Sequence, residues 1–105
     1  MYNYKIVIEY DGTNFVGWQQ QENGQSIQSA LQDALFKLSN EKVTIFGAGR
    51  TDAGVHAYGQ VASFILSKKI ETDVIRDGLN QHLRPHPIAL QNAELVDDDF
   101  HARFS

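Results

Sequence analysis

Hydrophobic and polar positions alternate along the first ten residues of the chain. Every second position from residue 2 onward is apolar or aromatic, namely Tyr2, Tyr4, Ile6, Ile8 and Tyr10. A period of two is typical of a β-strand with one buried face, so residues 2–10 are predicted to form a strand. Asp11-Gly12 then gives a turn signal. In the polar loop that follows we expect Phe15 and Trp18 to pack against the core, with stacking on a nucleic-acid base as the alternative.

A helical period begins after this loop. Ser26 is a suitable N-cap, and apolar residues then recur at spacings of three and four. These apolar positions are Ile27, Ala30, Leu31, Ala34, Leu35 and Leu38. The pattern predicts a helix of about 20 Å with one apolar stripe, at about 1.5 Å per residue.

The second half of the chain repeats this alternation of strands and a helix. Residues 43–46 and 60–66 are rich in β-branched and aromatic residues and are predicted to be strands. Thr72 is the expected cap of a second helix, which ends near Leu83 because two prolines follow. Residues 88–96 complete the pattern as a fourth strand.

The predicted order is strand, helix, strand, strand, helix, strand. This order is that of an α+β fold, the βαββαβ unit of ferredoxin-like and RRM-like domains. It predicts a four-stranded antiparallel sheet with two helices on one face, which leaves the other face open. A single domain over residues 1–105 is expected.

Composition narrows the class of protein. With 42% hydrophobic and 21% charged residues the chain has the composition of a folded soluble domain. It contains no cysteine, which excludes disulfides and thiolate zinc sites and favours a cytoplasmic location. The sequence shows no signal peptide and no apolar run of about 20 residues, so no membrane association is expected.

The formal net charge of -4 argues against a free-standing nucleic-acid binder. The nine Lys and Arg residues are dispersed, and Lys68-Lys69 is the only adjacent pair. If RNA is the substrate, further positive charge must come from elsewhere.

The segment most suggestive of chemistry is Gly47 to Ala57. It holds one carboxylate, Asp52, among three glycines, with Arg50 two positions before it and His56 four positions after it. In an extended segment Arg50 and Asp52 project to the same side, and pairing would keep the carboxylate ionised. The alternative from the residues alone is that Asp52 caps a short turn while Arg50 forms an ordinary surface ion pair.

Other readings of this segment fit less well. No Gly-Lys-Ser or Gly-Lys-Thr follows the glycines, and their spacing differs from the dinucleotide fingerprint. Asp52 and His56 could face one metal ion, but a third ligand is not visible, so no metal site is expected.

Three motifs together resemble one family. The segment Gly49-Arg50-Thr51-Asp52-Ala53-Gly54-Val55-His56-Ala57 with Gly59-Gln60-Val61 resembles the active-site motif of the tRNA pseudouridine synthase A (TruA) family. Tyr10-Asp11-Gly12-Thr13 with Phe15, Gly17-Trp18-Gln19 and Gln21 is similar to its N-terminal motif, and Phe100-His101-Ala102-Arg103 to the motif at its domain junction. The motifs occur in the family's order and span nearly the whole chain.

The resemblance implies an isomerase that converts uridine to pseudouridine in the anticodon stem and loop of tRNA, without a cofactor. It implies that Asp52 is the nucleophile, acting on the sugar or the base, or moving a proton near the 2′ position. The target base must leave its stack and enter a pocket. Arg50 is the candidate for orienting Asp52 and for filling the vacated space, with His56 and Tyr58 as further substrate-binding candidates. A purely local role for His56, with its polar atoms satisfied within its own turn, is the alternative.

The resemblance also implies that the chain is the N-terminal, aspartate-bearing domain of a longer two-domain enzyme. The family's later tyrosine motif and a basic residue of its C-terminal half are not found in these 105 residues. We therefore expect the isolated chain to be inactive and the full-length protein to be a cytoplasmic homodimer.

Two non-catalytic readings stay open at this point. An RRM-like RNA-binding domain would use the open face of the sheet, although the aromatic patterns of such domains are not evident on the inner strands. An assembly domain would pair that face with another copy or domain, and the apolar Phe100 and Phe104 suit such a contact.

Overall fold

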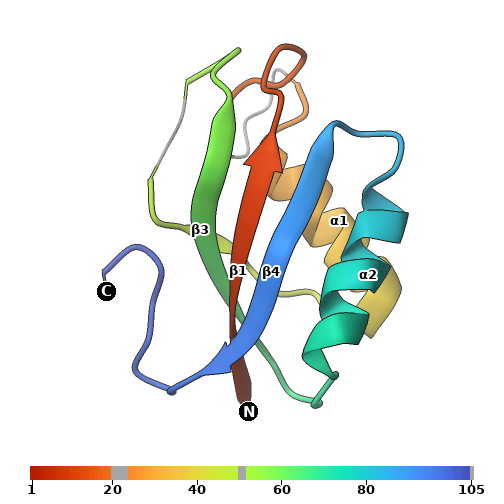
Figure 1. Ribbon diagram of the computed structural model, residues 1–105, viewed down its shortest axis with the longest axis vertical. Coiled ribbons are helices and arrows are strands. Elements are labelled where there is room, and N and C mark those ends of the chain that lie inside the picture. The colour runs from red at the N-terminus through yellow and green to blue at the C-terminus, as the bar shows by residue number, and fades with distance from the viewer. Residues whose placement is uncertain (20–23, 50–51, 105) are drawn as a thin grey trace.

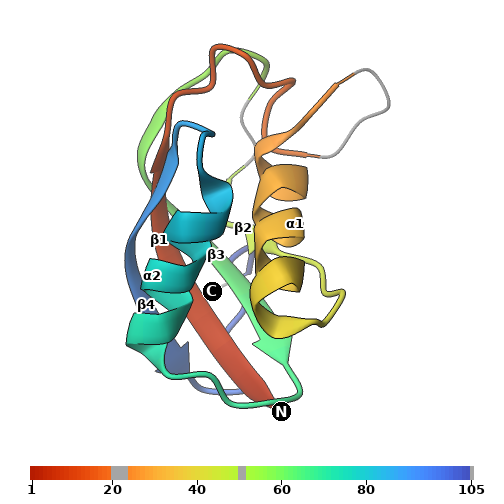
Figure 2. The same ribbon diagram turned by 90° about the vertical axis from the view of Figure 1, so that its right-hand side faces the viewer.

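The computed structural model describes residues 1–19, 24–49 and 52–104 and contains the six predicted elements in the predicted order. They are β1 (Tyr2–Tyr10), α1 (Ile27–Ser39), β2 (Phe46–Gly47), β3 (Ala57–Leu66), α2 (Thr72–Leu83) and β4 (Ile88–Val96). The strands form one antiparallel sheet in the order β2-β3-β1-β4. Both helices cover the same face of the sheet (Figures 1 and 2), so the predicted ferredoxin-like α+β fold is confirmed.

The core lies between the sheet and the two helices. Tyr4, Ile6 and Ile8 of β1 are fully buried, as the alternating pattern requires. The Tyr4 ring stacks on Phe64 of β3 with centroids 5.4 Å apart, and its hydroxyl donates to the Ile70 carbonyl oxygen. β1 is the central strand, because it pairs with β3 on one side and β4 on the other.

Helix α1 starts where the sequence predicts. The Ser29 amide donates to Ser26 Oγ, and the Ser26 amide donates to Ser29 Oγ, so the two residues form a reciprocal capping box. Asn40 ends the helix in the left-handed conformation with φ of 59°. The predicted apolar stripe is the buried side of the helix.

The predicted strand over residues 43–46 is wrong in its extent. Only Phe46 and Gly47 pair with β3, opposite Ser63 and Ala62. The Ile45 amide instead donates to Gln32 Oε1 at 3.0 Å, and its carbonyl accepts from Gln28 Nε2 at 3.0 Å. Side chains of α1 thus make the hydrogen bonds to the Ile45 backbone that a neighbouring strand would otherwise make.

The predicted cap of the second helix is displaced by one residue. Glu71 is the N-cap of α2 and makes no side-chain capping bond, while Thr72 is the first helical residue. Asp73 lies in the first turn, as predicted, where its negative charge interacts favourably with the positive end of the helix dipole.

The face of the sheet opposite the helices is partly covered, contrary to the prediction of an open face. Residues 97–104 cross it towards β2, a path visible in Figure 1. Asn3 Nδ2 donates to the carbonyl oxygens of Asp97 and Phe100, both at 2.8 Å, and the Ala102 amide donates to Ser63 Oγ at 2.9 Å. Asn3 and Ser63 are only 3% and 2% exposed as a result.

Candidate active site

Asp52 lies in the loop that joins β2 to β3. Its side chain is exposed, and its carbonyl oxygen accepts from the Val55 amide at 3.2 Å, which closes a tight turn. Gly54 within this turn has φ of 79°, a conformation that glycine adopts without strain. The turn therefore presents the carboxylate to the surface on a short, constrained segment of backbone.

The loop after β1 packs against this turn and supports it. The Gly54 amide donates to the Phe15 carbonyl oxygen at 3.3 Å. Gly12 packs directly on the turn, because a Cβ atom at that position would lie 1.9 Å from the Val55 carbonyl oxygen. Glycine is required here by the close approach of the two backbones.

His56 ties the same two loops together. Its Nδ1 accepts a hydrogen bond from the Gly12 amide at 3.0 Å, so the proton of the neutral ring resides on Nε2. Asp11 Oδ1 lies 3.1 Å from the same Nδ1 atom. These partners lie in the loop after β1 and not in the turn of His56 itself, as the local alternative had it.

The carboxylate of Asp11 is itself held by Thr13. The Thr13 hydroxyl and amide both donate to Asp11 Oδ1, and these bonds, with a smaller contribution from His56, lower the pKa of Asp11. Because this pKa is lowered, the ionised Asp11 carboxylate stabilises the folded protein at pH values above its ordinary pKa. This stabilisation is lost as pH falls through the lowered pKa.

Thr13→Val should raise the pKa of Asp11 towards its ordinary value, because the hydroxyl donor is the largest cause of the shift. An NMR titration of the Asp11 carboxyl carbon measures this change. Thr44→Val, at an exposed position before β2, serves as the control and should leave the titration unaltered. Identical Asp11 titrations in wild type and Thr13→Val would contradict the assignment.

Tyr58 is largely exposed to solvent. At the start of β3, it is 83% exposed, and its carbonyl oxygen accepts from Gln91 Nε2. It lines a shallow hollow of about 250 Å³ together with Glu9, Tyr10, Asp11 and His56. Tyr58 and His56 thus line the same hollow, while Asp52 is not among its lining residues.

Arg50 lies outside the described residues, so its predicted pairing with Asp52 stays a prediction. The chain just before it is held by Gln60, whose Nε2 donates to the Gly49 carbonyl oxygen. Gly47, where this segment leaves β2, is covered by the Trp18 indole. Trp18 is 3% exposed and Phe15 is 5% exposed, which confirms that both aromatics pack against the core.

Comparison with known proteins decides the family. A family model described as tRNA pseudouridine synthase matches residues 6–105. The chain belongs to this family. The curated relatives that match it include three proteins named tRNA pseudouridine synthase A. That of Afipia carboxidovorans is 58% identical over the whole chain and 43% of the relative. That of Ehrlichia ruminantium (strain Gardel) is 59% identical over 97% of the chain and 42% of the relative, and that of Rhodospirillum centenum 52% over the whole chain and 43%.

The chain thus spans less than half the length of these tRNA pseudouridine synthases. Its fold nevertheless brings two of the three segments that carry the family resemblance into direct contact, and the third lies on the strand next to them. The loop after β1 seats the turn of Asp52, through Gly12 and Phe15. Residues 100–103, which resemble the domain-junction motif, lie against β2. The centroids of the His101 and Phe46 rings are 4.5 Å apart. The match of the family model to residues 6–105 confirms the family that the motifs resemble.

Sequence reasoning did not identify Gly12 and Trp18 as supports of the loop that carries Asp52. Both lie in the N-terminal motif of the family, where the sequence predicted only a turn at Gly12 and packing of Trp18 against the core. The available signal for Gly12 was its place directly after a strand, where a glycine indicates a turn or a close backbone approach. No comparable signal marked the contact between Trp18 and Gly47, which are 29 positions apart.

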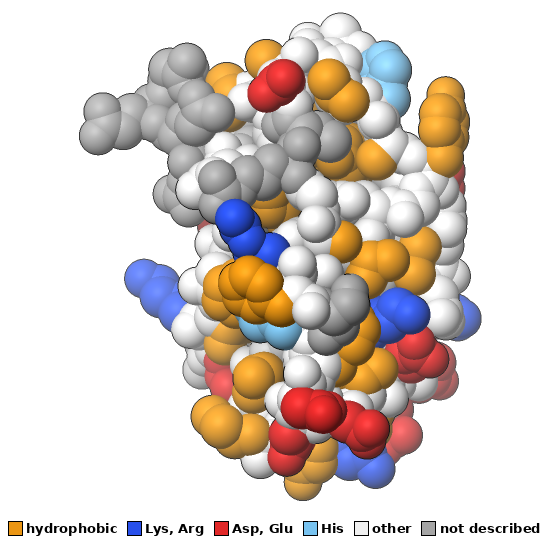
Figure 3. Space-filling view, turned by 90° about the vertical axis from the view of Figure 1, so that its left-hand side faces the viewer, with side chains coloured by type: hydrophobic (Ala, Val, Ile, Leu, Met, Phe, Trp, Pro, Cys, Tyr) orange, Lys and Arg blue, Asp and Glu red, His pale blue; other side chains and the backbone are white. Residues whose placement is uncertain are grey.

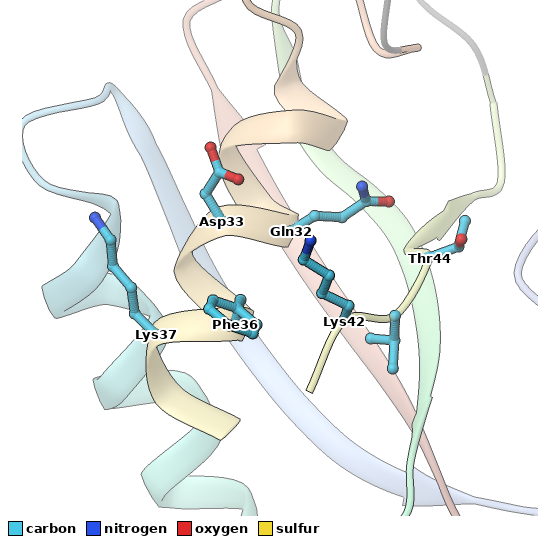
Figure 4. Close-up of a pocket in the computed structure, with 7 residues that line it drawn as sticks. Gln32, Asp33, Phe36, Lys37, Lys42 and Thr44 are labelled. Atoms are coloured by element: carbon cyan, nitrogen blue, oxygen red, sulfur yellow. The ribbon is translucent and has the colours of Figure 1, made fainter. Parts of the chain in front are cut away.

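A larger hollow, of about 540 Å³, lies away from Asp52 on the helical layer. Figure 4 shows its residues projecting from α1 and from the segment before β2, with Phe36 between Asp33, Lys37 and Lys42. Its mixed charges and its place on α1 give no link to the motifs of the family.

Within residues 1–19, 24–49 and 52–104, no three His, Cys, Asp or Glu side chains gather as a metal site. In the same part of the chain, neither helix is long and apolar enough to cross a membrane.

Proposed function

We propose that the complete protein isomerises uridine to pseudouridine in the anticodon stem and loop of tRNA, with Asp52 as the nucleophile. The observation that carries this proposal is the placement of Asp52. The family's aspartate is exposed on a tight turn, and that turn is fixed by Gly12, Phe15 and His56. A reactive group on a constrained turn is presented to a bulky substrate without a further loss of loop entropy.

The chemistry needs little beyond such a carboxylate. The bond between uracil N1 and the sugar C1′ breaks, the base turns, and a bond forms between C5 and C1′. A proton leaves C5 and a proton is gained at N1, so the reaction is an isomerisation with no net oxidation or reduction. A carboxylate assists by covalent attack or by proton transfer.

The same proposal assigns roles to the other site residues. Arg50 orients Asp52 and fills the space that the flipped uridine vacates. Tyr58 offers an exposed ring for contact with the substrate, and His56, whose Nδ1 holds the Gly12 amide, contacts RNA through the rest of its half-exposed ring.

The chain itself is proposed to be the N-terminal domain, residues 1–105, of a two-domain enzyme. This proposal is supported by its coverage of 43% of relatives such as that of Afipia carboxidovorans. The net charge of -4 supports it as well, because tRNA needs a cationic surface that the other domain or a second subunit would supply. We include a homodimer and a cytoplasmic location in this proposal.

Release of tritium from unmodified tRNA carrying [5-³H]uridine tests the function, because the C5 hydrogen is lost in the reaction. The complete protein should release tritium, and residues 1–105 alone should release none. No release by the complete protein would overturn the function. Sustained turnover by residues 1–105 would overturn the requirement for a second domain.

The rival RRM-like reading is weakened by a specific observation. An RRM-like domain would bind RNA across the face of the sheet opposite the helices. Here residues 97–104 cross that face and bury Asn3 and Ser63 on its central strands, so a strand of RNA would have to displace them.

A further inference from the structure

A second hollow, of about 510 Å³, lies at the β2 edge of the sheet. The loop after β1 forms one wall, β2 another, and the C-terminal segment the third. Its lining includes Trp18, Gln19, Phe46, His101, Arg103 and Phe104. Figure 3 faces this side of the molecule and shows hydrophobic, His and Lys or Arg side chains gathered near its middle.

Three rings form a row along this hollow. The His101 ring lies between Phe46 and Phe104, with centroids 4.5 Å and 4.8 Å away. Phe46 is 41% exposed and Phe104 is 79% exposed, so two large apolar rings face outward. Exposed aromatic rings of this kind are the platforms on which proteins stack the bases of single-stranded RNA.

Arg103 adds a cation beside the rings. Its guanidinium lies over Phe104, 5.9 Å from the ring centroid. None of the ion pairs recorded among the described residues involves Arg103. A planar, exposed guanidinium next to stacking rings suits the phosphate of a stacked nucleotide. The exposed Gln19 amide provides a donor and an acceptor for a base edge.

The site is held in place by the sheet. The Ala102 amide donates to Ser63 Oγ, and within the turn the Arg103 amide donates to His101 Nδ1 at 3.1 Å. The Phe104 amide donates to the His101 carbonyl oxygen at 3.0 Å. The residues that would touch a ligand are therefore positioned before it binds, which lowers the entropy cost of binding.

The hollow is also close to the proposed nucleophile along the chain. Gly47 lines it, and four residues of chain separate Gly47 from Asp52, so the two lie at most about 18 Å apart. An extended single strand covers this span with a few nucleotides.

We propose that this hollow binds a nucleotide of the RNA substrate that neighbours the target uridine. Its base stacks on Phe104 and Phe46, and its phosphate pairs with Arg103. The inference rests on the proposed function, to which it adds a second point of contact with the RNA. The rival occupant is a further part of the complete protein, which would cover the same rings.

Affinity for an unmodified RNA stem-loop, measured with the complete protein, tests this site. Phe104→Ala and Phe46→Ala should each weaken binding about tenfold, as expected for the loss of one stacked base. Phe36→Ala is the matched control, because Phe36 is also 41% exposed but lies on α1. Arg103→Gln should lower the slope of log affinity against log salt by about 0.7, the change for one phosphate on a single strand. Arg76→Gln, on α2, should not change it.

The alternative outcomes are distinct. If Phe104→Ala leaves RNA affinity unchanged but lowers the melting temperature by several degrees, the rings are covered by protein and the proposal is wrong. Because the experiment measures affinity, it tests RNA binding in the hollow even if no uridine is converted. Phe104-dependent RNA binding without any turnover would overturn the proposed function alone, and a complete protein that binds no RNA would overturn both.

Discussion

Asp52→Asn in the complete protein is expected to slow pseudouridine formation by about a thousandfold or more while leaving tRNA affinity nearly unchanged. Asparagine keeps the shape of the side chain but can neither attack as an anion nor accept a proton as a carboxylate does. Because the side chain is exposed on its turn, the substitution removes no core contact. Tritium release gives the rate, and filter binding of unmodified tRNA gives the affinity.

Asp33→Asn supplies the control for this experiment. Asp33 is an exposed carboxylate on α1, so the variant makes the same change in charge away from the site. It should retain wild-type turnover and affinity. Undiminished turnover in Asp52→Asn would remove the basis of the assignment, and a pure RNA-binding domain would show no difference between the two variants.

Gly12→Ala is expected to have the largest effect on stability. The new methyl group would lie 1.9 Å from the Val55 carbonyl oxygen, so the two loops must separate. Overpacking of this kind costs about 1–3 kcal/mol, and for a domain of this size each kcal/mol lowers the melting temperature by about 4–8 °C. Turnover should fall as well, since the displaced turn carries Asp52. Thermal unfolding followed by circular dichroism measures the first effect, and tritium release the second.

Gly59→Ala is the matched comparison, because nothing lies within 4 Å of the position where its Cβ would be. Gly59 lies in β3, where alanine is accommodated without strain. This variant should unfold at or slightly above the wild-type temperature. Equal melting temperatures for the two alanine variants would show that the loops are not interlocked at Gly12.

The elements that could be predicted from the sequence are those in which local signals and burial agree. The apolar residues of β1 recur at every second position because one face packs under the helices, and α1 has both a capping residue and an apolar stripe. Residues 43–45 resemble a strand by their β-branched side chains, but their hydrogen bonds depend on two glutamines of α1. Propensity alone does not reveal such a long-range competitor.

The motif supplied the candidate site residues, whose roles stay predictions, but not the contacts that hold them in place. Asp52, His56 and Tyr58 came from the motif, and the structure brings His56 and Tyr58 to one hollow. The hydrogen bond from Gly12 to His56 joins residues 44 positions apart, and the cover over Asn3 comes from residues 97 and 100. Contacts of this kind follow from the sheet order, which no local pattern of the chain encodes.

The central position of β1 has a consequence for how the chain folds. The first strand to leave the ribosome needs two partners, β3 and β4, and the second of these ends only at Val96. Until then at least one edge of β1 is free, a state in which strands of different molecules can associate. Nascent chains that stall before Val96 should therefore depend most strongly on chaperones that shield an unpaired β1.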